Sequence, residues 1–342
     1  VAGFARDPQP HERLYADAGL SPLLAHDVRG ELADLGALTA LMGDFQPEFV
    51  FHLAAQPLVR LSYDIPVETF ATNVMGTVNV LEALRCYSAS QLPSTCVAVM
   101  ITTDKCYENR EWLHAYREED PMGGHDPYSA SKGCAELVVA SYRNSFFEGG
   151  DGEERIRVAS ARAGNVIGGG DWAADRIVPD CFRAIRAGGA IPVRNKIATR
   201  PWQHVLEPIS GYLWLGAALD QSARLDYPDS SPYRSAFNFG PTLTSNRTVK
   251  ELVEELLKHT GGNWEDRSDP NARQEACKLN LAVDKAFHLL GWQPTWNFET
   301  TIAETAAWYV REASGESPAD LCDQQIRAYT VAAKDKGLAW AG

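Results

Sequence analysis

Excess positive charge and long apolar runs are both absent from this chain of 342 residues. Lysine and arginine total 32 against 45 aspartates and glutamates, which gives a net charge of −13. This balance argues against a nucleic-acid backbone or an anionic membrane surface as a partner, although a local basic pocket for a diphosphate is compatible with it. No apolar run approaches the roughly 20 residues of a membrane span, and no segment resembles a secretory leader. We therefore expect a cytoplasmic protein.

Paired cysteines and metal-binding clusters are also lacking. The seven cysteines are scattered, without a Cys-x-x-Cys motif or a Cys/His cluster. Reduced, structural thiols are therefore expected, and neither a disulfide framework nor a metal site is predicted. His52 and His204 have no second histidine or carboxylate at ligand spacing, so we expect them to be packed inside or to lie at a substrate edge.

The first residues lack a glycine-rich turn. Val1 to Asp7 reads as the second strand of a dinucleotide-binding fold, ending in an acidic residue where an adenosine ribose would lie. The first strand and the glycine-rich loop of such a fold are missing before it, so we expect the natural chain to be longer. We also expect residues 1–342 alone to fold and hold a dinucleotide poorly, because the helix N-terminus that receives the diphosphate is missing.

Short, β-branched apolar runs alternate with amphipathic helical stretches along the chain. This alternation predicts an α/β fold with a doubly wound parallel sheet of the Rossmann type and a smaller, mainly helical C-terminal domain. Expected strands are Val1–Ala5, Leu23–Ala25, Phe49–Ala54, Cys96–Thr102, Ile156–Ala161 and Ala236–Phe239. Expected helices are Leu32–Met42, Pro66–Cys86, Tyr128–Phe146, Glu207–Leu219, Val249–His259, Val283–Leu290 and Phe298–Glu312. Residues 1–165 and 204–240 are assigned to the dinucleotide-binding domain, and residues 166–203 and 241–342 to the substrate domain.

Tyr128 and Lys132 lie four residues apart on one face of an expected helix, and Thr103-Asp104-Lys105 ends a buried strand upstream. An ammonium one helical turn from a phenol favours the phenolate and lowers its pKa from about 10 toward neutral. Tyr-x-x-x-Lys alone is weak, because such pairs occur on ordinary helices. Together with Asp104 and Lys105, which could act as an acid and a base, the Tyr128–Lys132 pair predicts a redox site beside an elimination site.

Several longer runs carry a family resemblance. They are His52-Leu-Ala-Ala-Gln56, Thr72-Asn-Val-Met-Gly76, Thr102-Thr-Asp-Lys-Cys-Tyr107, Tyr128-Ser-Ala-Ser-Lys132, Arg162-Ala-Gly-Asn-Val-Ile-Gly-Gly-Gly-Asp-Trp172 and Arg200-Pro-Trp-Gln-His-Val205. With these runs the chain resembles the extended short-chain dehydrogenase/reductases, in particular the nucleotide-sugar 4,6-dehydratases. The Asp104-Lys105 pair and the Glu108 to Trp112 run narrow the resemblance to the enzymes of this family that act on CDP-glucose.

The resemblance implies a reaction that runs through bound NAD. Tyr128 would take the proton from O4 of the sugar while the C4 hydride leaves, with Thr103 bonded to the same oxygen and Lys132 holding the ribose. Asp104 would then protonate the departing C6 hydroxyl after C5 loses its proton, and the hydride would return to C6. Lys105 stands where relatives have a carboxylate base, and acts either as that base or as an electrostatic stabiliser of the enolate.

The resemblance also implies the binding residues. For the cofactor they are Asp7, Asp27, Val28, Ala54, Ala55, Gln56 and Asn73, together with Tyr128 and Lys132. Arg6 is either a solvated turn residue or a contact for a 2′-phosphate, and NAD is preferred over NADP. For the substrate they are Asn165, Arg194, Arg200, His204 and Arg273, because guanidinium groups suit paired phosphate oxygens.

Two alternative functions remain at this point. A nucleotide-sugar 4-epimerase would share Tyr128, Lys132 and Thr103 but would have no need of the acid/base pair Asp104-Lys105. A catalytically silent binding relative would explain the missing glycine-rich unit, but it has no physical need of the complete catalytic set. The apolar helices Pro66–Cys86 and Tyr128–Phe146 further predict a homodimer through a four-helix interface, as in the family.

Overall fold

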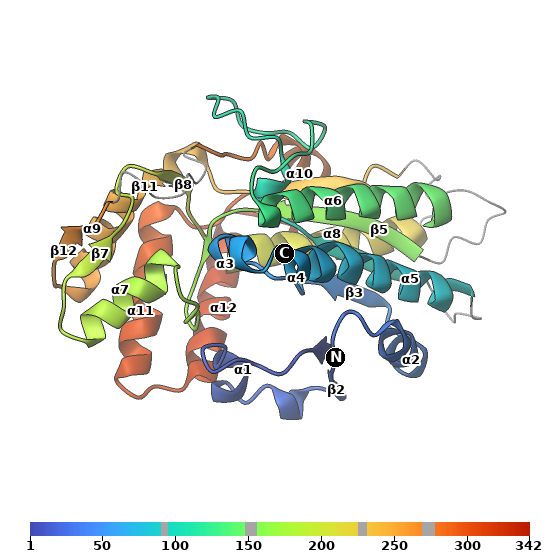
Figure 1. Cartoon of the computed structure of the whole chain (residues 1–342), viewed down its shortest axis with the longest axis horizontal. Coiled ribbons are helices and arrows are strands. Elements are labelled where there is room, and N and C mark those ends of the chain that lie inside the picture. Colours follow the sequence, from blue (N-terminus) through green and yellow to red (C-terminus); the bar gives the residue numbers. More distant parts are fainter. Residues whose placement is uncertain (90–94, 148–155, 225–230, 269–277) are drawn as a thin grey trace.

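A four-stranded parallel sheet forms the centre of the molecule. A computed structural model describes residues 1–89, 95–147, 156–224, 231–268 and 278–342. The strands are β3 (Phe49–His52), β4 (Cys96–Ile101), β5 (Ile156–Ala163) and β10 (Ala236–Phe239), in the order β10-β5-β4-β3 (Figure 1). All three neighbouring pairs are parallel. The predicted parallel α/β sheet is confirmed.

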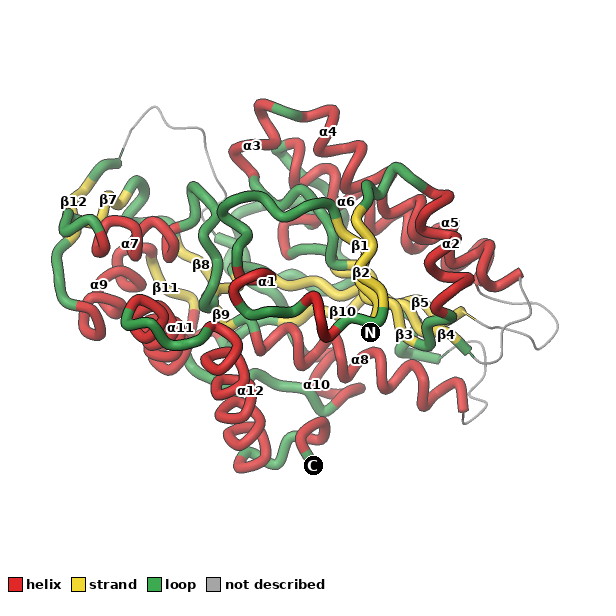
Figure 2. The backbone as a smooth tube through the Cα atoms, turned by 90° about the horizontal axis from the view of Figure 1, so that it is seen from below, coloured by secondary structure: helices red, strands yellow, loops and turns green. Residues whose placement is uncertain are grey.

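Two further strands form a separate parallel pair, β1 (Ala2–Ala5) and β2 (His26–Arg29). Within the described chain β1 pairs with β2 alone, and Figure 2 shows this pair near the N-terminus, in front of the central sheet. The strand predicted at Leu23–Ala25 is wrong. Ser21–Leu23 is a 3-10 helix instead, because Pro22 fixes the backbone angle that suits a helix start and cannot donate to a strand ladder.

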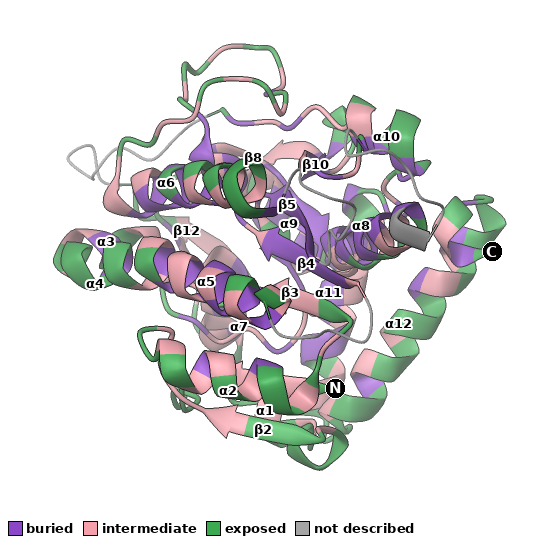
Figure 3. Cartoon of the chain, turned by 90° about the vertical axis from the view of Figure 1, so that its right-hand side faces the viewer, coloured by how far each residue is buried: buried purple, intermediate pink, exposed green. Residues whose placement is uncertain are grey.

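Helices cover both faces of the central sheet. On one face lie α5 (Gly76–Ala89) and α6 (Pro127–Tyr142), with α2 (Leu35–Phe45) packed against α5, and on the other face lies α8 (Leu206–Arg224). Strand β4 is buried nearly throughout (Figure 3), which explains why its sequence is a continuous apolar run rather than an alternating one. The sheet is therefore doubly wound.

Most predicted helices are confirmed, with shifted ends. The helix expected from Leu32 begins at Leu35, because the Asp34 side chain accepts a hydrogen bond from the Ala37 amide (2.9 Å) and caps it. The helix expected over Pro66–Cys86 consists of α4 (Pro66–Phe70), a π-helical turn (Ala71–Met75) and α5, and α6 likewise continues into a π-helical turn (Arg143–Phe147). Three more confirmed helices are α9 (Val249–Thr260), α10 (Asp284–Leu290) and α11 (Phe298–Ala313).

The remaining elements gather mainly at the other end of the molecule (Figures 1 and 2). A second hydrophobic core joins α7 (Ile177–Arg186), α9, α11 and short strands. The strands are β6 (Val166–Ile167), β7 (Ile191–Val193), β8 (Thr199–Pro201), β9 (Gln203–His204), β11 (Asn246–Thr248) and β12 (Trp264–Asp266). The sequence prediction missed these strands, along with α7, α1 (Leu14–Asp17), α3 (Val59–Asp64) and α12 (Pro318–Asp335). In the described residues, no helix has both the length and the apolar character to cross a membrane.

Candidate active site

The predicted catalytic residues meet at the carboxyl end of β4. Thr103 to Lys105 follow this strand directly, and Asp104 begins a 3-10 helix that contacts α6. Helix α6 brings Tyr128 and Lys132 to the same place from its first two turns. In open α/β sheets, ligands bind outside the carboxyl ends of parallel strands, so the cluster lies where the fold places a binding site.

Local capping fixes where α6 starts, and hence where Tyr128 lies. The Asp126 carboxylate accepts hydrogen bonds from the Ser129 amide (2.9 Å) and the Ser129 hydroxyl (2.6 Å). Pro127 occupies the first turn, where its missing N–H costs nothing. The Tyr128 amide donates to the Ser62 hydroxyl of α3 (3.2 Å). The phenol side chain is consequently held in the first helical turn and is buried.

The Lys132 ammonium lies one turn further along and is also buried. Its Nζ donates to the carbonyl oxygen of Ile101 (3.1 Å), the last residue of β4. Burial lowers the pKa of Lys132 to about 8. The charge of the Glu136 carboxylate has the opposite effect and raises this pKa. An ammonium group has three donors, so Lys132 retains hydrogen-bonding capacity beyond its contact with β4.

The structure differs from the sequence expectation for the Tyr128 phenol. Burial raises the pKa of Tyr128 to about 12, a hydrogen bond with Thr103 lowers it, and the Asp104 charge raises it again. The direction is opposite to the one expected from the neighbouring ammonium, because desolvation of the phenolate is the largest effect. In this state of the protein Tyr128 is a neutral phenol at neutral pH.

Asp104 is fully buried beside Thr103. Its Oδ1 accepts from the Thr103 hydroxyl (3.0 Å) and from the Lys105 ammonium (3.4 Å), while its Oδ2 has no hydrogen-bond partner within the described part of the chain. Lys105 is only partly exposed, with its amide donating to the Thr103 hydroxyl (3.4 Å). A buried carboxyl oxygen without a protein partner is uncommon and points to a functional role.

Gly164 is a close neighbour of Asp104 to which the sequence reasoning gave no role. A Cβ atom at this position would lie 1.9 Å from Asp104 Oδ2, so a side chain here would displace the carboxylate. Gly164 follows β5 directly. Its position inside the Arg162-Ala-Gly-Asn run was the available signal, since a glycine just after a strand marks a close approach.

The segment after β3 is fixed by Asn73 of the π-helical turn. Its side-chain oxygen accepts from the Gln56 amide (2.8 Å), and its Nδ2 donates to the Gln56 carbonyl oxygen (3.1 Å) and to the Ser131 hydroxyl (2.9 Å). Asn73 therefore joins this segment to α6 between Tyr128 and Lys132. Ala54 is exposed and Ala55 partly buried, just beyond the carboxyl end of β3.

The predicted adenosine contacts lie on the β1–β2 pair. Asp7 is exposed two residues beyond the end of β1. Asp27 and Val28 pair with Gly3 and Phe4 across the two strands. The Asp27 carboxylate accepts hydrogen bonds from Tyr15, Ser21 and Arg29, and these bonds, the Tyr15 one foremost, lower its pKa.

The predicted substrate residues occupy different environments. Asn165 has a left-handed backbone (φ 45°) just after β5 and Gly164. Arg194 is bound by Asp175 and by Asp180 (3.0 Å), and Arg200 donates to the Thr199 carbonyl oxygen (2.9 Å). The His204 ring is buried against Trp296, and burial lowers its pKa to about 3. Arg273 lies outside the described residues.

Comparison with known proteins agrees with this arrangement. A family model described as GDP-mannose 4,6 dehydratase matches residues 21–305. The chain is 41% identical over 334 residues to a CDP-glucose 4,6-dehydratase from Salmonella typhimurium, which covers 97% of this chain and 89% of that protein. The chain belongs to the nucleotide-sugar 4,6-dehydratase family.

Other relatives of this nucleotide-sugar dehydratase include both dehydratases and epimerases. A CDP-paratose 2-epimerase from Salmonella typhi is 31% identical over 304 residues, covering 82% of this chain and 83% of that protein. The crystal structure of a dTDP-glucose 4,6-dehydratase from Streptomyces venezuelae with NAD bound has a TM-score of 0.69 and 22% identity, covering 89% of this chain and 85% of that one. This likeness shows the shared Rossmann-type fold.

Proposed function

We propose that this protein is an NAD-dependent lyase that converts CDP-glucose to CDP-4-keto-6-deoxyglucose. The observation that carries the proposal is the buried Asp104 carboxylate beside Tyr128 and Thr103, an acid group that 4,6-dehydration requires and simple epimerisation does not. The 41% identity to a CDP-glucose 4,6-dehydratase supports the choice of CDP over other nucleotides.

The donor set suits a dinucleotide. The spare Lys132 donors lie at the carboxyl end of β4 and suit the hydroxyls of the nicotinamide ribose. Ala54, Ala55 and Gln56 border the middle of the cofactor, with Asn73 holding their backbone. Asp7 accepts the adenosine ribose hydroxyls, and Asp27 and Val28 border the adenine. When bound, NAD supplies the acceptor for the C4 hydride and the donor that returns it to C6.

NAD is preferred over NADP at the adenosine ribose. The Arg6 guanidinium is paired with the Glu12 carboxylate (2.6 Å) and donates to the Asp7 carbonyl oxygen (2.9 Å). A 2′-phosphate would have to displace Glu12 to gain this guanidinium, while the exposed Asp7 carboxylate would repel it. These charges favour a free 2′-hydroxyl.

Oxidation at C4 requires Tyr128 to accept the O4 proton, although burial keeps its pKa near 12. Two side chains favour the phenolate, namely Thr103 by its hydrogen bond and the Arg176 guanidinium by its charge. The Tyr128 phenol must first lose its own proton to solvent, and the phenolate then accepts the O4 proton, with Thr103 bonded to the same sugar oxygen. Proton transfer by a positioned group of this kind contributes about 10²–10⁴-fold to the rate.

Elimination of water uses the residues that follow Thr103. The 4-keto group acidifies the C5 proton, and Asp104, once it has taken up a proton from solvent, donates it to the departing C6 hydroxyl through Oδ2, which has no partner among the described residues. Lys105 acts at C5 either as the base or as an electrostatic stabiliser of the enolate. Its contact with Asp104 Oδ1 (3.4 Å) places the ammonium on the same side of the site as the acid.

The nucleotide diphosphate is assigned to the second region of the fold. Asn165, Arg194, Arg200 and Arg273 are proposed to bind it, and His204 is proposed to lie at the edge of the substrate. Asp175 and Asp180 hold Arg194 until substrate replaces them. Residues 166–203 and 241–342 form the proposed substrate domain, and residues 1–165 with 204–240 form the dinucleotide domain. The short pairing of β6 with β9 lies at this boundary.

We also propose a cytoplasmic homodimer. Large apolar side chains are exposed along α4, α6 and the π-helical turns that follow each of them, where a second copy would cover them: Val67, Phe70, Met75, Leu137 and Phe146. Light scattering at micromolar concentration should give the dimer mass for the unaltered protein. Val67→Asp should shift it toward monomer, whereas the control Val331→Asp, at an exposed position on α12, should leave it a dimer.

A mass assay tests the proposed reaction. The protein is incubated with NAD and, separately, with CDP-, dTDP-, UDP- and GDP-linked glucose, and each product is weighed. We expect loss of one water, fastest with the CDP sugar. A product of unchanged mass would indicate an epimerase, and binding without turnover would indicate a silent relative.

A further inference from the structure

Glu136 is a buried carboxylate of α6, one helical turn beyond Lys132. Its Oε2 accepts hydrogen bonds from the Arg162 guanidinium (2.8 Å) and the Ser160 hydroxyl (2.8 Å), both on β5. Its Oε1 accepts from the Thr102 hydroxyl, next to the catalytic Thr103. One carboxylate thus joins the helix that carries Tyr128 and Lys132 to the chain on which Thr103 and Asp104 lie.

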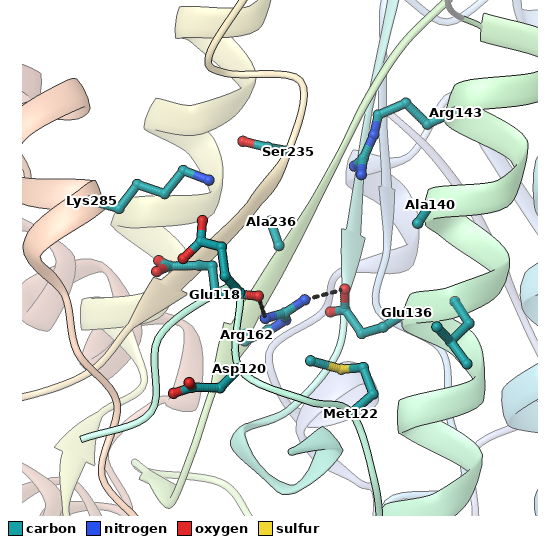
Figure 4. A pocket seen from close by; sticks show the side chains of 12 residues that line it. Glu118, Asp120, Met122, Glu136, Ala140, Arg143, Arg162, Ser235, Ala236 and Lys285 are labelled. Carbon is teal, nitrogen blue, oxygen red and sulfur yellow. Dashed lines mark hydrogen bonds and ion pairs between the residues drawn. The ribbon is translucent and has the colours of Figure 1, made fainter. Parts of the chain in front are cut away.

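The Arg162 guanidinium extends this connection to the segment that follows Asp104. It donates to the Tyr107 hydroxyl (2.7 Å) and to the Glu118 carbonyl oxygen (2.9 Å), and the Tyr107 hydroxyl donates to the Asn238 side chain (2.7 Å). Figure 4 shows Arg162 and Glu136 pointing toward one another beside a pocket of about 300 Å³. Both side chains are at least nine-tenths buried.

We propose that Glu136 is a positioning residue for hydride transfer, which holds Tyr128 and Lys132 against the Thr102–Asp104 segment and supplies a buried negative charge one helical turn from the ammonium. This inference rests on the proposed function only in requiring hydride transfer at Tyr128. An epimerase would need the same step, so the two hypotheses fail separately.

The charge of Glu136 is secured by its partners. Burial raises the pKa of the Glu136 carboxyl, but the Arg162 charge and the hydrogen bonds from Arg162, Thr102 and Ser160 outweigh burial and leave it below its usual value. The carboxylate is therefore ionised at neutral pH, and it opposes the effect of burial on the Lys132 pKa.

Other titratable groups face this centre. Near Lys132 these are His52, whose pKa burial and the Lys132 charge lower to about 3, and Cys106, whose pKa burial raises, so both are uncharged at neutral pH. Tyr128 is faced by Asp104, Asp126, Arg176 and Tyr212. On the far side of Arg162, the pocket presents Glu118, Glu119, Asp120, Arg143 and Lys285. Of the groups named here, Glu136 is the carboxylate whose negative charge raises the Lys132 pKa.

Removing this charge should narrow the pH range of hydride transfer from its alkaline side. Without Glu136 the Lys132 pKa falls further, so the ammonium is lost at lower pH and the alkaline limit moves down. A purely structural role would lower the rate while leaving the width of the profile unchanged.

The experiment compares the Glu136→Gln variant with the unaltered protein. Both are used as the full chain with NAD and substrate. Reduced nicotinamide is followed by its absorbance in a single turnover between pH 6 and pH 10. We expect the rate to fall about 10- to 100-fold, with a narrower pH profile, because a displacement of about 1 Å in a reacting group costs this much. Without cofactor, amide hydrogen exchange of residues 101–106 should become about tenfold faster, since local opening is easier.

Glu207→Gln is the matched control. Glu207 is also a fully buried carboxylate, and it accepts from the amides of Thr295 (2.8 Å) and Trp296 (2.6 Å) and from the Tyr329 hydroxyl (2.7 Å). Its substitution should lower the melting temperature while leaving the width of the pH profile and the exchange of residues 101–106 unchanged.

A double variant separates positioning from folding. Glu136→Gln combined with Arg162→Met removes both charges, so no unpaired buried guanidinium remains to unfold the protein. We expect this variant to fold and still show a narrowed profile. If the double variant, or a folded Glu136→Gln, keeps the unaltered width and exchange rates, the proposal is overturned.

Discussion

The Tyr128–Lys132 site and the Arg194 cluster are held together by different means. Tyr128, Lys132 and Asp104 are buried, and hydrogen bonds from α6, β4 and the Asn73 side chain fix the segments that carry them. Arg194 is exposed, and the carboxylates of Asp175 and Asp180 bind it. Surface ion pairs of this kind contribute about 0–1 kcal/mol each, whereas buried polar groups must keep their partners.

This difference shows which of the two regions is already ordered before a ligand binds. The chemical groups are placed by the fold before any ligand arrives, so a change there should lower the rate. The proposed diphosphate group is held by exchangeable partners, so a change there should alter the concentration of substrate required. Five substitutions test this division, from the largest expected effect to the smallest.

Tyr128→Phe should cause the largest loss. The variant keeps the ring packed in the first turn of α6 but removes the hydroxyl that accepts the O4 proton. We expect hydride transfer to fall about 10²–10⁴-fold, with an unchanged melting temperature. Reduced nicotinamide in a single turnover is the measurement. Near-normal turnover would show that Tyr128 is only a core aromatic.

Asp104→Asn should separate the two halves of the reaction. Oxidation at C4 needs no acid at C6, but loss of the C6 hydroxyl does, so the variant should accumulate reduced cofactor or a 4-keto sugar that retains its water. Overall dehydration should fall about 10²–10⁴-fold. Product mass and nicotinamide absorbance distinguish these steps. Normal dehydration would mean that another donor is the acid.

Arg194→Gln should act on binding rather than on chemistry. We expect KM for the nucleotide sugar to rise about tenfold, the effect of roughly 1.4 kcal/mol, with kcat nearly unchanged.

Asp175→Asn should lower KM, because a competing carboxylate is removed while asparagine tolerates the left-handed backbone there (φ 63°). Equal falls in kcat for both variants would contradict the division between the two regions.

Lys132→Met should stabilise the fold. Since burial depresses the Lys132 pKa to about 8, the ammonium destabilises the folded state below that pH, and the penalty disappears as pH rises toward the unfolded pKa of 10.5. Methionine should therefore add about 1–3 kcal/mol to the free energy of unfolding at pH 7, and less above pH 8. Melting curves at pH 7 and pH 10 check this. A gain that is absent at pH 7 would contradict the buried-ammonium account.

The clustering of Tyr128 and Lys132 with Thr103 to Lys105 was predictable because its signals are local. Tyr128 and Lys132 are one helical turn apart, and the fold places the residue run after β4 beside the next helix along the chain. Glu136 follows the same spacing from Lys132, but its value depends on Arg162 from β5, and no local pattern predicts that partner. The direction of the Tyr128 pKa shift was also missed, because burial is a property of the folded chain and not of the helix.

The second region was harder to predict for physical reasons. Its strands are two or three residues long, too short for an alternating pattern to be distinguished from a loop. The partners of Arg194 come from residues 14 and 19 positions away, across α7 and a loop. The run Leu23–Ala25 is apolar like a strand, but Pro22 just before it favours the start of a 3-10 helix at Ser21–Leu23.

The most direct test of the central claim uses CDP-glucose carrying deuterium at C4. If Tyr128, Thr103 and Asp104 run oxidation, elimination and reduction at one site, the product loses one water, the deuterium appears at C6, and C5 carries a proton from solvent. Mass spectrometry and deuterium NMR locate the label. Deuterium retained at C4 in a product of unchanged mass would contradict the account and identify epimerisation instead.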